Sequence, residues 1–290
     1  MSDTITEAFI QGYKEGFLEL FQQKGSKLRP YMRVENQSAK SDFYDRIGAT
    51  TVAQRTVRHG DSPYIATPHS RRMNVMQDFH WGDFVDDQDK IRTLNDPTNP
   101  YVRAGAMAMG RKVDTLILEG LIGSAWGGET GTTEATYASE ALTTILHGSA
   151  GLTFAKLRAA KAAFGNVDVP QDANLVVACT ATQISDLMNE DKLTSADYQQ
   201  VRALVNGEMS TAFGFTFVQI SPSFLTVASN IRDCVCFVAD HNVLGMGIEP
   251  EGHIERRADK GFSTYVYMAM SAGATRLEGE SVVTIECDES

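Results

Sequence analysis

The sequence predicts an α+β fold, and three observations support this class. Residues 99–123 and 153–165 have the apolar spacing of helices. Runs such as residues 174–180 and 233–241 are short, apolar and rich in β-branched or aromatic side chains, as buried strands are. These strands and helices do not alternate regularly as βαβ units, and the sequence has no internal repeat.

Composition narrows the class of protein. With 290 residues, of which 42% are hydrophobic, the chain is long enough to bury one large core or two ordinary ones. The net charge of -11 opposes attraction to phosphate backbones, so we expect no sequence-specific binding of nucleic acid. No run of eighteen apolar residues occurs, so we expect no membrane partner. The four cysteines form no C-x-x-C pair, which indicates buried free thiols and a reducing cytoplasm.

The N-terminal segment has the pattern of a short amphipathic helix. Its aromatic residues recur at every fourth position and form one stripe, at Phe9, Tyr13, Phe17 and Phe21. Residues 24–48 behind it are polar and irregular. We therefore expect an arm that docks on another surface rather than a part of the core.

Residues 49–89 have the pattern of extended chain. A strand over residues 73–85 places its apolar side chains on one face, namely Met73, Val75, Phe79, Trp81 and Val85. Residues 50–60 are a weaker strand candidate, and residues 60–70 between them hold two prolines, as loops do. Together they predict a long two-stranded arm that could reach roughly 60 Å. Such a hairpin is not stable alone, so we expect it to lie on another surface.

A long helix is predicted over residues 99–123. Asn99 is a suitable cap, Pro100 suits the first helical position, and Gly123 suits the end of the helix. Its expected buried stripe consists of Val102, Ala106, Met109, Val113, Leu116 and Gly120. At 1.5 Å per residue this helix is about 36 Å long, so we expect it to be the spine of the fold.

The remaining sequence predicts a mixed domain. Residues 123–140 form a loop rich in glycine and threonine, and the helix 153–165 packs through Phe154, Leu157 and Phe164. Strands are expected at residues 174–180, 213–221 and 233–241, and helices at 182–188 and 195–207. Residues 261–288 supply two or three further strands.

One segment, "DFHWGDFVDDQDK" at residues 78–90, is dense in aspartate and suggests a metal or acid-base site. An EF-hand loop starting at Asp87 would need glycine at Arg92 and a carboxylate at Thr98. On a strand, His80 and Asp83 point to opposite faces. The glycine-rich residues 127–133 lack the ending of a P-loop, and residues 147–151 lack the order G-x-S-x-G. We therefore expect no catalytic residue, metal or cofactor, and a solvated or interface strand at residues 78–90.

Three stretches carry a resemblance to a known family. They are "DDQDKIRTLNDPTNPYVRAGAMAMGRKVDTLILEG" at 86–120, "VRALVNGEMSTAFGFTFVQIS" at 201–221 and "GATRLEGESVVTIECD" at 273–288. In this order they resemble the major capsid protein of tailed bacteriophages, which has the Hong Kong-ninety-seven capsid fold. The resemblance implies an N-terminal arm at 1–46, an extended loop at 47–90, a peripheral domain with the spine helix at 91–170, an axial domain at 171–262 and closing strands of the peripheral domain at 263–290.

The resemblance also implies a function and a set of contacts. The chain would be no enzyme but a structural protein that assembles in the host bacterial cytoplasm into hexamers and pentamers, giving the icosahedral virion shell around double-stranded DNA. Residues 78–90 would be the return strand of the extended loop, with carboxylates paired to arginines of neighbouring subunits. The expected interface residues are Phe9, Tyr13, Phe17, Phe21, Arg55, Arg71, Arg72, Trp81, Asp83, Asp86 and Asp87.

The chain departs from the pattern of some family members in two ways, which concern the scaffolding protein and covalent crosslinking. Because about a hundred residues precede the spine, we expect a scaffolding protein to be a separate chain, beside a portal and a possible decoration or cement protein. No lysine occurs between Lys40 and Lys90, so covalent crosslinking through the loop is not expected. An encapsulin-like cellular compartment with the same fold remains an alternative, and a soluble hydrolase is a further one.

Overall fold

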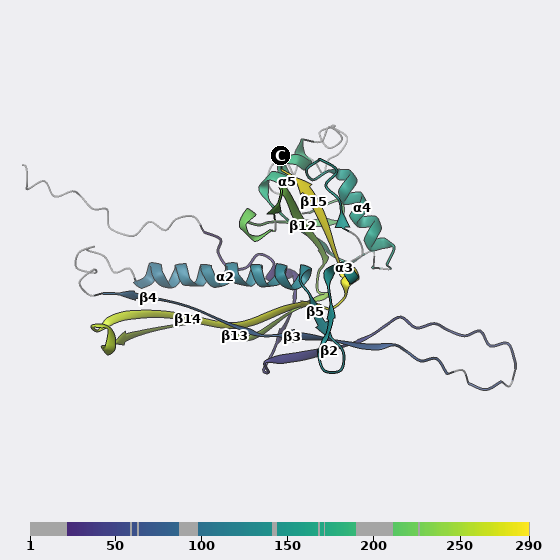
Figure 1. The fold of residues 1–290 in the computed structure, drawn as a ribbon, viewed down its shortest axis with the longest axis horizontal. Coiled ribbons are helices and arrows are strands. Elements are labelled where there is room, and N and C mark those ends of the chain that lie inside the picture. The colour runs from purple at the N-terminus through teal and green to yellow at the C-terminus, as the bar shows by residue number, and fades with distance from the viewer. Residues whose placement is uncertain are drawn as a thin grey trace, which may run out of the picture.

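The computed structural model describes residues 22–58, 60–62, 64–86, 98–140, 144–167, 169–170, 172–189, 211–225 and 227–289. In this part of the chain, a long platform of helix and sheet carries a compact domain near one end, and a slender loop projects beyond it (Figure 1). The predicted helix at 195–207 and the predicted arm helix lie outside the described residues. None of the described helices has the length and apolarity needed to cross a membrane.

The platform is a four-stranded sheet covered on one face by helix α2 (Thr98–Ile122). Its strand order is β1 (Arg33–Asn36), β13 (Asn242–Arg257), β14 (Ser263–Arg276) and β4 (Gln77–Val85). The predicted spine helix is confirmed to within a residue or two at each end. The sequence did not predict β13, because its last ten residues are exposed and show no apolar alternation.

The buried face of α2 differs in part from the predicted stripe. Met109, Val113 and Leu116 are buried as expected. Ala106 is exposed, whereas its neighbour Gly105 is buried against the sheet. A Cβ at Gly105 would lie 2.7 Å from the sulfur of Met268, so glycine allows the helix to approach the sheet closely at this point.

A second sheet forms the root of the projecting loop. Strand β2 (Ser41–Ile47) pairs antiparallel with β3 (His69–Val75), and β5 (Ala125–Gly127) and β6 (Thr133–Ala135) complete the order β2-β3-β5-β6. The strand predicted at 50–60 is wrong, and so is its pairing with 73–85. Residues 73–85 are extended as predicted, but they are divided between β3 and β4, which belong to different sheets. The described residues between 48 and 68 contain no strand, and β4 runs back along β14 in the platform, not along the loop.

The chain changes sheets at Met76, whose backbone N–H donates to Lys40 O at 2.9 Å. This single residue between β3 and β4 also inverts the buried face. In β4, Phe79, Trp81 and Val85 face inward as predicted. In β3, however, Val75 is exposed, and Arg72 and Asn74 are buried.

The compact domain is built on a sheet with the order β7-β15-β12-β8-β10-β9, to which β11 adds beside β12. The bounds are β7 (Thr144–Ile145), β8 (Leu175–Cys179), β9 (Thr211–Ala212), β10 (Phe215–Gln219), β11 (Val227–Ala228), β12 (Ile231–Val238) and β15 (Val282–Asp288). Pairs β8–β10 and β7–β15 are parallel, and the others are antiparallel. The last two strands of the chain therefore join different sheets, β14 in the platform and β15 here.

Helices α4 (Phe154–Gly165) and α5 (Ala181–Met188) belong to this domain, and α3 (Tyr137–Glu140) joins it to the platform. Single 3-10 turns occur at η2 (Arg29–Tyr31), η3 (Pro222–Phe224), η4 (Ala258–Lys260) and η5 (Gly279–Ser281). The positions of α4, α5, β8, β10 and β12 confirm the sequence predictions, because each has a local apolar pattern and a clear stop.

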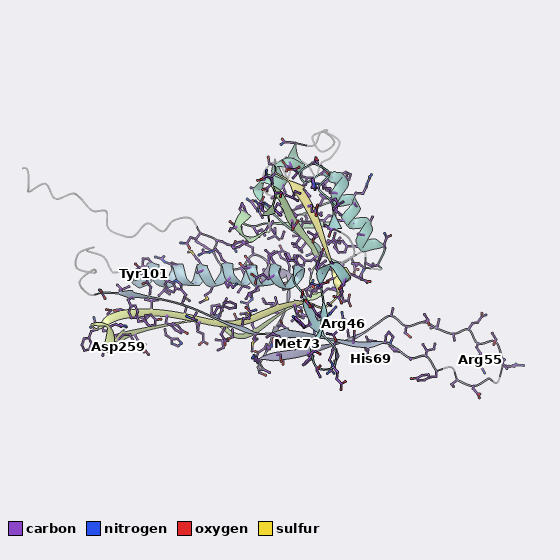
Figure 2. The ribbon with its side chains drawn as sticks, viewed as in Figure 1. Arg46, Arg55, His69, Met73, Tyr101 and Asp259 are labelled. Atoms are coloured by element: carbon purple, nitrogen blue, oxygen red, sulfur yellow. The ribbon has the colours of Figure 1, made fainter. Side chains whose placement is uncertain are left out.

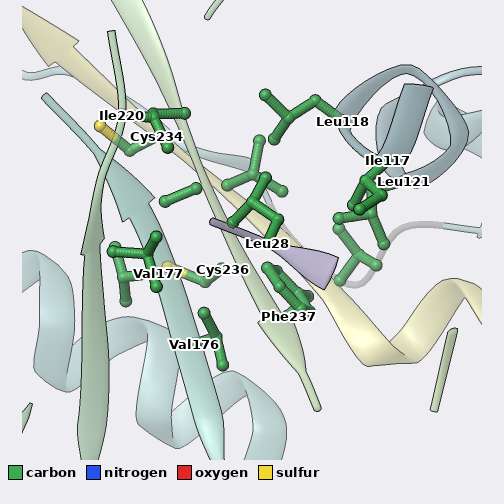
Figure 3. Packing of buried hydrophobic residues seen from close by; sticks show 14 of the residues in the cluster. Leu28, Ile117, Leu118, Leu121, Val176, Val177, Ile220, Cys234, Cys236 and Phe237 are labelled. Carbon is green, nitrogen blue, oxygen red and sulfur yellow. The ribbon is translucent and has the colours of Figure 1, made fainter. Parts of the chain in front are cut away.

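One hydrophobic core joins the parts. Leu28 from the arm meets Ile117 and Leu121 of α2 and Phe237 of β12 (Figure 3). Leu28 is fully buried, so the expectation that residues 24–48 lie outside the core is wrong at this point. The four cysteines are free and buried as expected, and burial raises the pKa of the Cys179 thiol to about 12.

Candidate assembly surfaces

The most exposed surface is the projecting loop at residues 48–68, which reaches far beyond the body of the chain (Figure 2). Val52 is 97% exposed and Tyr64 is 91% exposed, and neither side chain has cover within the described residues. Burying such side chains contributes roughly 1.5–3 kcal/mol each. The loop therefore has apolar surface that a second molecule would stabilise.

Arg55 lies in the far part of this loop (Figure 2). Its Nε donates to Val57 O at 3.1 Å, and its Nη2 donates to Arg58 O. The guanidinium is exposed and pairs with no carboxylate among the described residues. Arg55 thus holds the local turn and keeps its charge available in the far part of the loop.

Arg71 and Arg72, both expected at an interface between subunits, have different surroundings in the structure. Both are in β3, at the root of the hairpin. Arg72 is 3% exposed, and its Nη2 donates to Glu140 Oε1. It faces into its own subunit.

Glu140 lies among several arginines. Arg276 is fully buried, and its Nε lies 3.6 Å from Glu140 Oε2. Arg72 Nε donates to Leu277 O at 3.3 Å, and Arg46 Nη1 donates to the same oxygen. Burial lowers the pKa of Arg276 and Glu140 raises it, which is the balance expected of a cation held inside by one carboxylate. This ion cluster connects β2, β3, α3 and the end of β14.

A second polar contact holds the next inward residue of β3. Asn74 Nδ2 donates to Gln37 Oε1 at 2.9 Å and to Gly273 O at 3.2 Å, and Gln37 Nε2 donates to Asn74 O at 3.2 Å. Both amides are 1% exposed. A Cβ on Gly245 would collide with the Gln37 and Asn74 side chains, and a Cβ on its partner Gly273 would collide with the backbone carbonyl of Val75, so the paired glycines let β3 approach the platform closely. Alternate residues of β3 therefore fix the hairpin to the platform.

Arg71 points the other way. Its Nε lies 3.1 Å from Asp45 Oδ1, and its guanidinium lies 5.5 Å from the centre of the Phe43 ring. The Arg71 side chain is 41% exposed, and that of Asp45 is 72% exposed. An exposed pair of this kind contributes about 0–1 kcal/mol, so Arg71 is free to exchange partners.

The predicted acidic partners lie at the opposite end of the platform. Asp83 and Asp86 are exposed at the end of β4, where Asp83 is in register with Val266 near the η4 turn. Asp259 marks that end in Figure 2, whereas His69 and Met73 mark the hairpin. One chain therefore does not bring Arg71 or Arg72 to these carboxylates. Trp81 packs against α2 beside Gly105. Asp87 and the aromatic stripe Phe9, Tyr13, Phe17 and Phe21 lie outside the described residues.

The sequence reading missed the anchor of the arm. Asp114 on α2 is fully buried and accepts hydrogen bonds from Lys27 N at 3.1 Å, Leu28 N at 3.0 Å and the Ser26 hydroxyl at 2.5 Å. One turn earlier, a Cβ on Gly110 would lie 2.5 Å from the backbone of Gly25. A glycine and an acid four positions apart on the apolar face were the available signal.

The chain is similar to known proteins in both sequence and fold. A family model described as phage capsid protein matches residues 5–289. The capsid of cyanophage P-SCSP1u aligns with a TM-score of 0.72 and 14% identity, covering 99% of this chain and 95% of that chain. The structure of Mycobacterium phage Che8 aligns with a TM-score of 0.70 and 20% identity, covering 96% of this chain and 97% of that chain. The capsid of Helicobacter pylori bacteriophage KHP30 aligns with a TM-score of 0.73 and 11% identity, covering 99% of this chain and 98% of that chain. A search of curated proteins by sequence gave no match.

Proposed function

This chain belongs to the phage capsid protein family, and from that premise we propose how its copies meet and what the finished shell contains. It is a major capsid protein, a structural component of the virion whose copies assemble into the head shell. We propose that the shell is icosahedral, closes through hexamers and pentamers, and encloses packaged double-stranded DNA. The net charge of -11 supports this cargo, because an acidic wall lets DNA slide rather than adhere.

The observation that supports our assembly scheme is the exposed loop. Val52 and Tyr64 are almost wholly exposed on a loop that reaches beyond its own subunit. A closed symmetric shell repeats one kind of contact, so the loop and its acceptor surface must both be on this chain. We assign the loop, including Arg55, to contact with the neighbouring subunit.

Charge placement suggests one further contact between copies. Arg71 is exposed at one end of the platform, and Asp83 and Asp86 are exposed at the other. Because they do not meet within one chain, we propose that they meet between adjacent copies, with Asp87 close by and Trp81 supporting the strand from behind. The aromatic stripe at Phe9, Tyr13, Phe17 and Phe21 would also be buried against a neighbour in the shell. Arg72 would act indirectly, by holding β3 to the body.

The family resemblance supplies the rest of the scheme. We propose an N-terminal arm at 1–46, an extended loop at 47–90, a peripheral domain at 91–170 completed by residues 263–290, and an axial domain at 171–262. Three strands pair across these bounds, since β4 of the loop and β13 of the axial segment lie in the platform and β15 lies in the compact sheet. We propose that assembly takes place in the host bacterial cytoplasm with a separate scaffolding protein and a portal. We propose further that a decoration or cement protein binds the finished shell.

Assembly of purified protein tests the scheme. Electron microscopy and light scattering should reveal closed shells, formed alone or with the co-expressed scaffolding protein. A variant with residues 50–66 replaced by a short glycine–serine linker should remain folded and form no closed shell. A monomer that persists for the unaltered chain under all salt and scaffold conditions would overturn the scheme. Nucleic acid inside native particles separates a phage head from a compartment filled with enzyme.

A further inference from the structure

An open hollow of about 640 Å³ lies between the base of the arm, helix α2 and the compact domain. Gln22, Lys27 and Arg111 form one side of it, and Ile220, Pro222 and Phe224 form the other. None of its lining residues belongs to the contacts assigned above.

The chemistry of the hollow is apolar and cationic. Its walls carry the ammonium of Lys27 and the guanidinium of Arg111, and none of its lining residues is acidic. Both cations are held in place: Lys27 Nζ donates to Gln219 O at 2.7 Å, and Arg111 Nη1 donates to Gln22 Oε1 at 2.8 Å. A ligand for this hollow would combine apolar side chains with carboxylates.

The chain itself contains such a ligand. Residues 1–21 hold the aromatic stripe together with four carboxylates and one lysine, in the order Asp3, Glu7, Lys14, Glu15 and Glu19. We propose that, in the free subunit, the N-terminal segment docks back into the hollow of its own chain. Phe17, Leu20 and Phe21 would fill the apolar side, and Glu15 and Glu19 would face Lys27 and Arg111.

The attachment of the N-terminal segment beside the hollow favours this segment over a separate chain. Gln22 is part of the wall, so the segment starts at the rim of the hollow. The anchor at Asp114 fixes the residues that follow, from Ser26 to Leu28. A segment attached at the rim experiences a local concentration in the millimolar range, which a separate chain in a dilute solution does not reach.

This inference rests on the proposed function, because it gives the aromatic stripe two alternative sites. In the free subunit the stripe would be covered by its own hollow, and in the shell it would be covered by a neighbour. The exchange would keep the aromatic side chains from causing premature association, as in other exchanges of one element between copies.

Disulfide trapping tests the docking. The double variant Leu20→Cys with Ser223→Cys, kept dilute and treated with diamide, should form a disulfide within one chain, with diamide reduced as the two thiols are oxidised. Peptide mapping identifies the pair, because the four native cysteines are buried. The matched pair Leu20→Cys with Ser70→Cys, whose second site is exposed on β3, should not crosslink. Absence of the first crosslink, or crosslinks between chains only, would overturn the inference.

A charge test uses the same crosslink. Lys27→Glu together with Arg111→Glu should slow its formation about tenfold, since two attractions become repulsions. Lys24→Glu together with Lys40→Glu, an equal charge change at two exposed residues outside the hollow, should leave the rate unchanged. Equal rates in all three proteins would contradict the charge match. Shells that form normally while no crosslink appears would remove this inference and leave the capsid role intact.

Discussion

The Arg72 guanidinium donates a hydrogen bond to Glu140 Oε1 across 68 positions of sequence, and this contact joins strand β3 to helix α3 inside the subunit. Its neighbour Arg71 faces outward and pairs with the exposed Asp45. Two adjacent arginines therefore have separate consequences, one for folding and one for contact between copies.

We predict that charge reversal separates these two roles. Arg72→Glu should lower the free energy of unfolding by about 3–5 kcal/mol, because it breaks a buried pair and leaves Glu140 facing another acid. Arg71→Glu should change it by less than about 1 kcal/mol and yet prevent closed particles. Urea unfolding and electron microscopy measure the two effects. Asp45→Asn removes the same internal pair but keeps the charge of Arg71, and it should still assemble. Normal shells from Arg71→Glu would remove this residue from the interface.

We predict that the two parts of the arm have different roles: residues before the anchor at Asp114 serve assembly, and those at the anchor serve folding. Deletion of residues 2–21 should leave the subunit folded and block correct shells, because the aromatic stripe is lost but Leu28 stays in the core. Leu28→Ala in the full chain should lower the free energy of unfolding by about 2–5 kcal/mol, as for other buried leucines. Circular dichroism with urea compares the two. An unfolded deletion variant would place the stripe in the core of its own subunit.

We predict that subunits are not covalently joined in the mature particle. The described loop residues contain no lysine, and none occurs in sequence between Lys40 and Lys90. Particles boiled in reducing detergent should therefore run as one band near the chain mass of 31.7 kDa. A ladder of multiples of that mass would show that another amine takes part.

We predict that mild acid relieves a repulsion in the compact domain. Asp233 and Glu286 are directly opposite each other on antiparallel strands β12 and β15. Burial raises the pKa of Asp233, and the Glu286 carboxylate raises it further. The folded state therefore binds a proton more readily than the unfolded state, so this pair opposes folding above the raised pKa and ceases to do so as the pH falls through it.

The variant Asp233→Asn tests this pair. It should raise the free energy of unfolding at pH 7 by about 0.2–1 kcal/mol, the range for one pair of cross-strand neighbours, and the gain should shrink as the pH is lowered towards 4. Glu280→Gln removes one negative charge at an exposed site and should show no such dependence. A gain that is the same at pH 4 and pH 7 would show that charge repulsion is not its cause.

Local patterns explain what could be read from the sequence. Helix α2 and strands β8 and β12 have apolar periods and clear ends within a few residues, so they were predicted closely. Strand β3 was misread because its inward residues are Arg72 and Asn74, whose partners come from distant segments. The same cause hid Asp114, which binds backbone N–H groups nearly ninety positions away. Contacts between copies depend on several chains at once, so the sequence of one chain suggests them only through charge and exposure.

The two inward residues of β3 hold the projecting loop at its root only, so the loop is fixed at one end. The described part of the loop touches little of its own subunit, so its direction is set where Asn74 and Arg72 hold the root. Any small rotation at the root becomes a larger displacement at the far end, in proportion to the length of the lever. We therefore expect the buried amide and guanidinium groups at the root to influence the curvature of the wall, and with it the diameter of the particle. A change such as Asn74→Leu would broaden the distribution of particle diameters while every contact surface keeps its sequence.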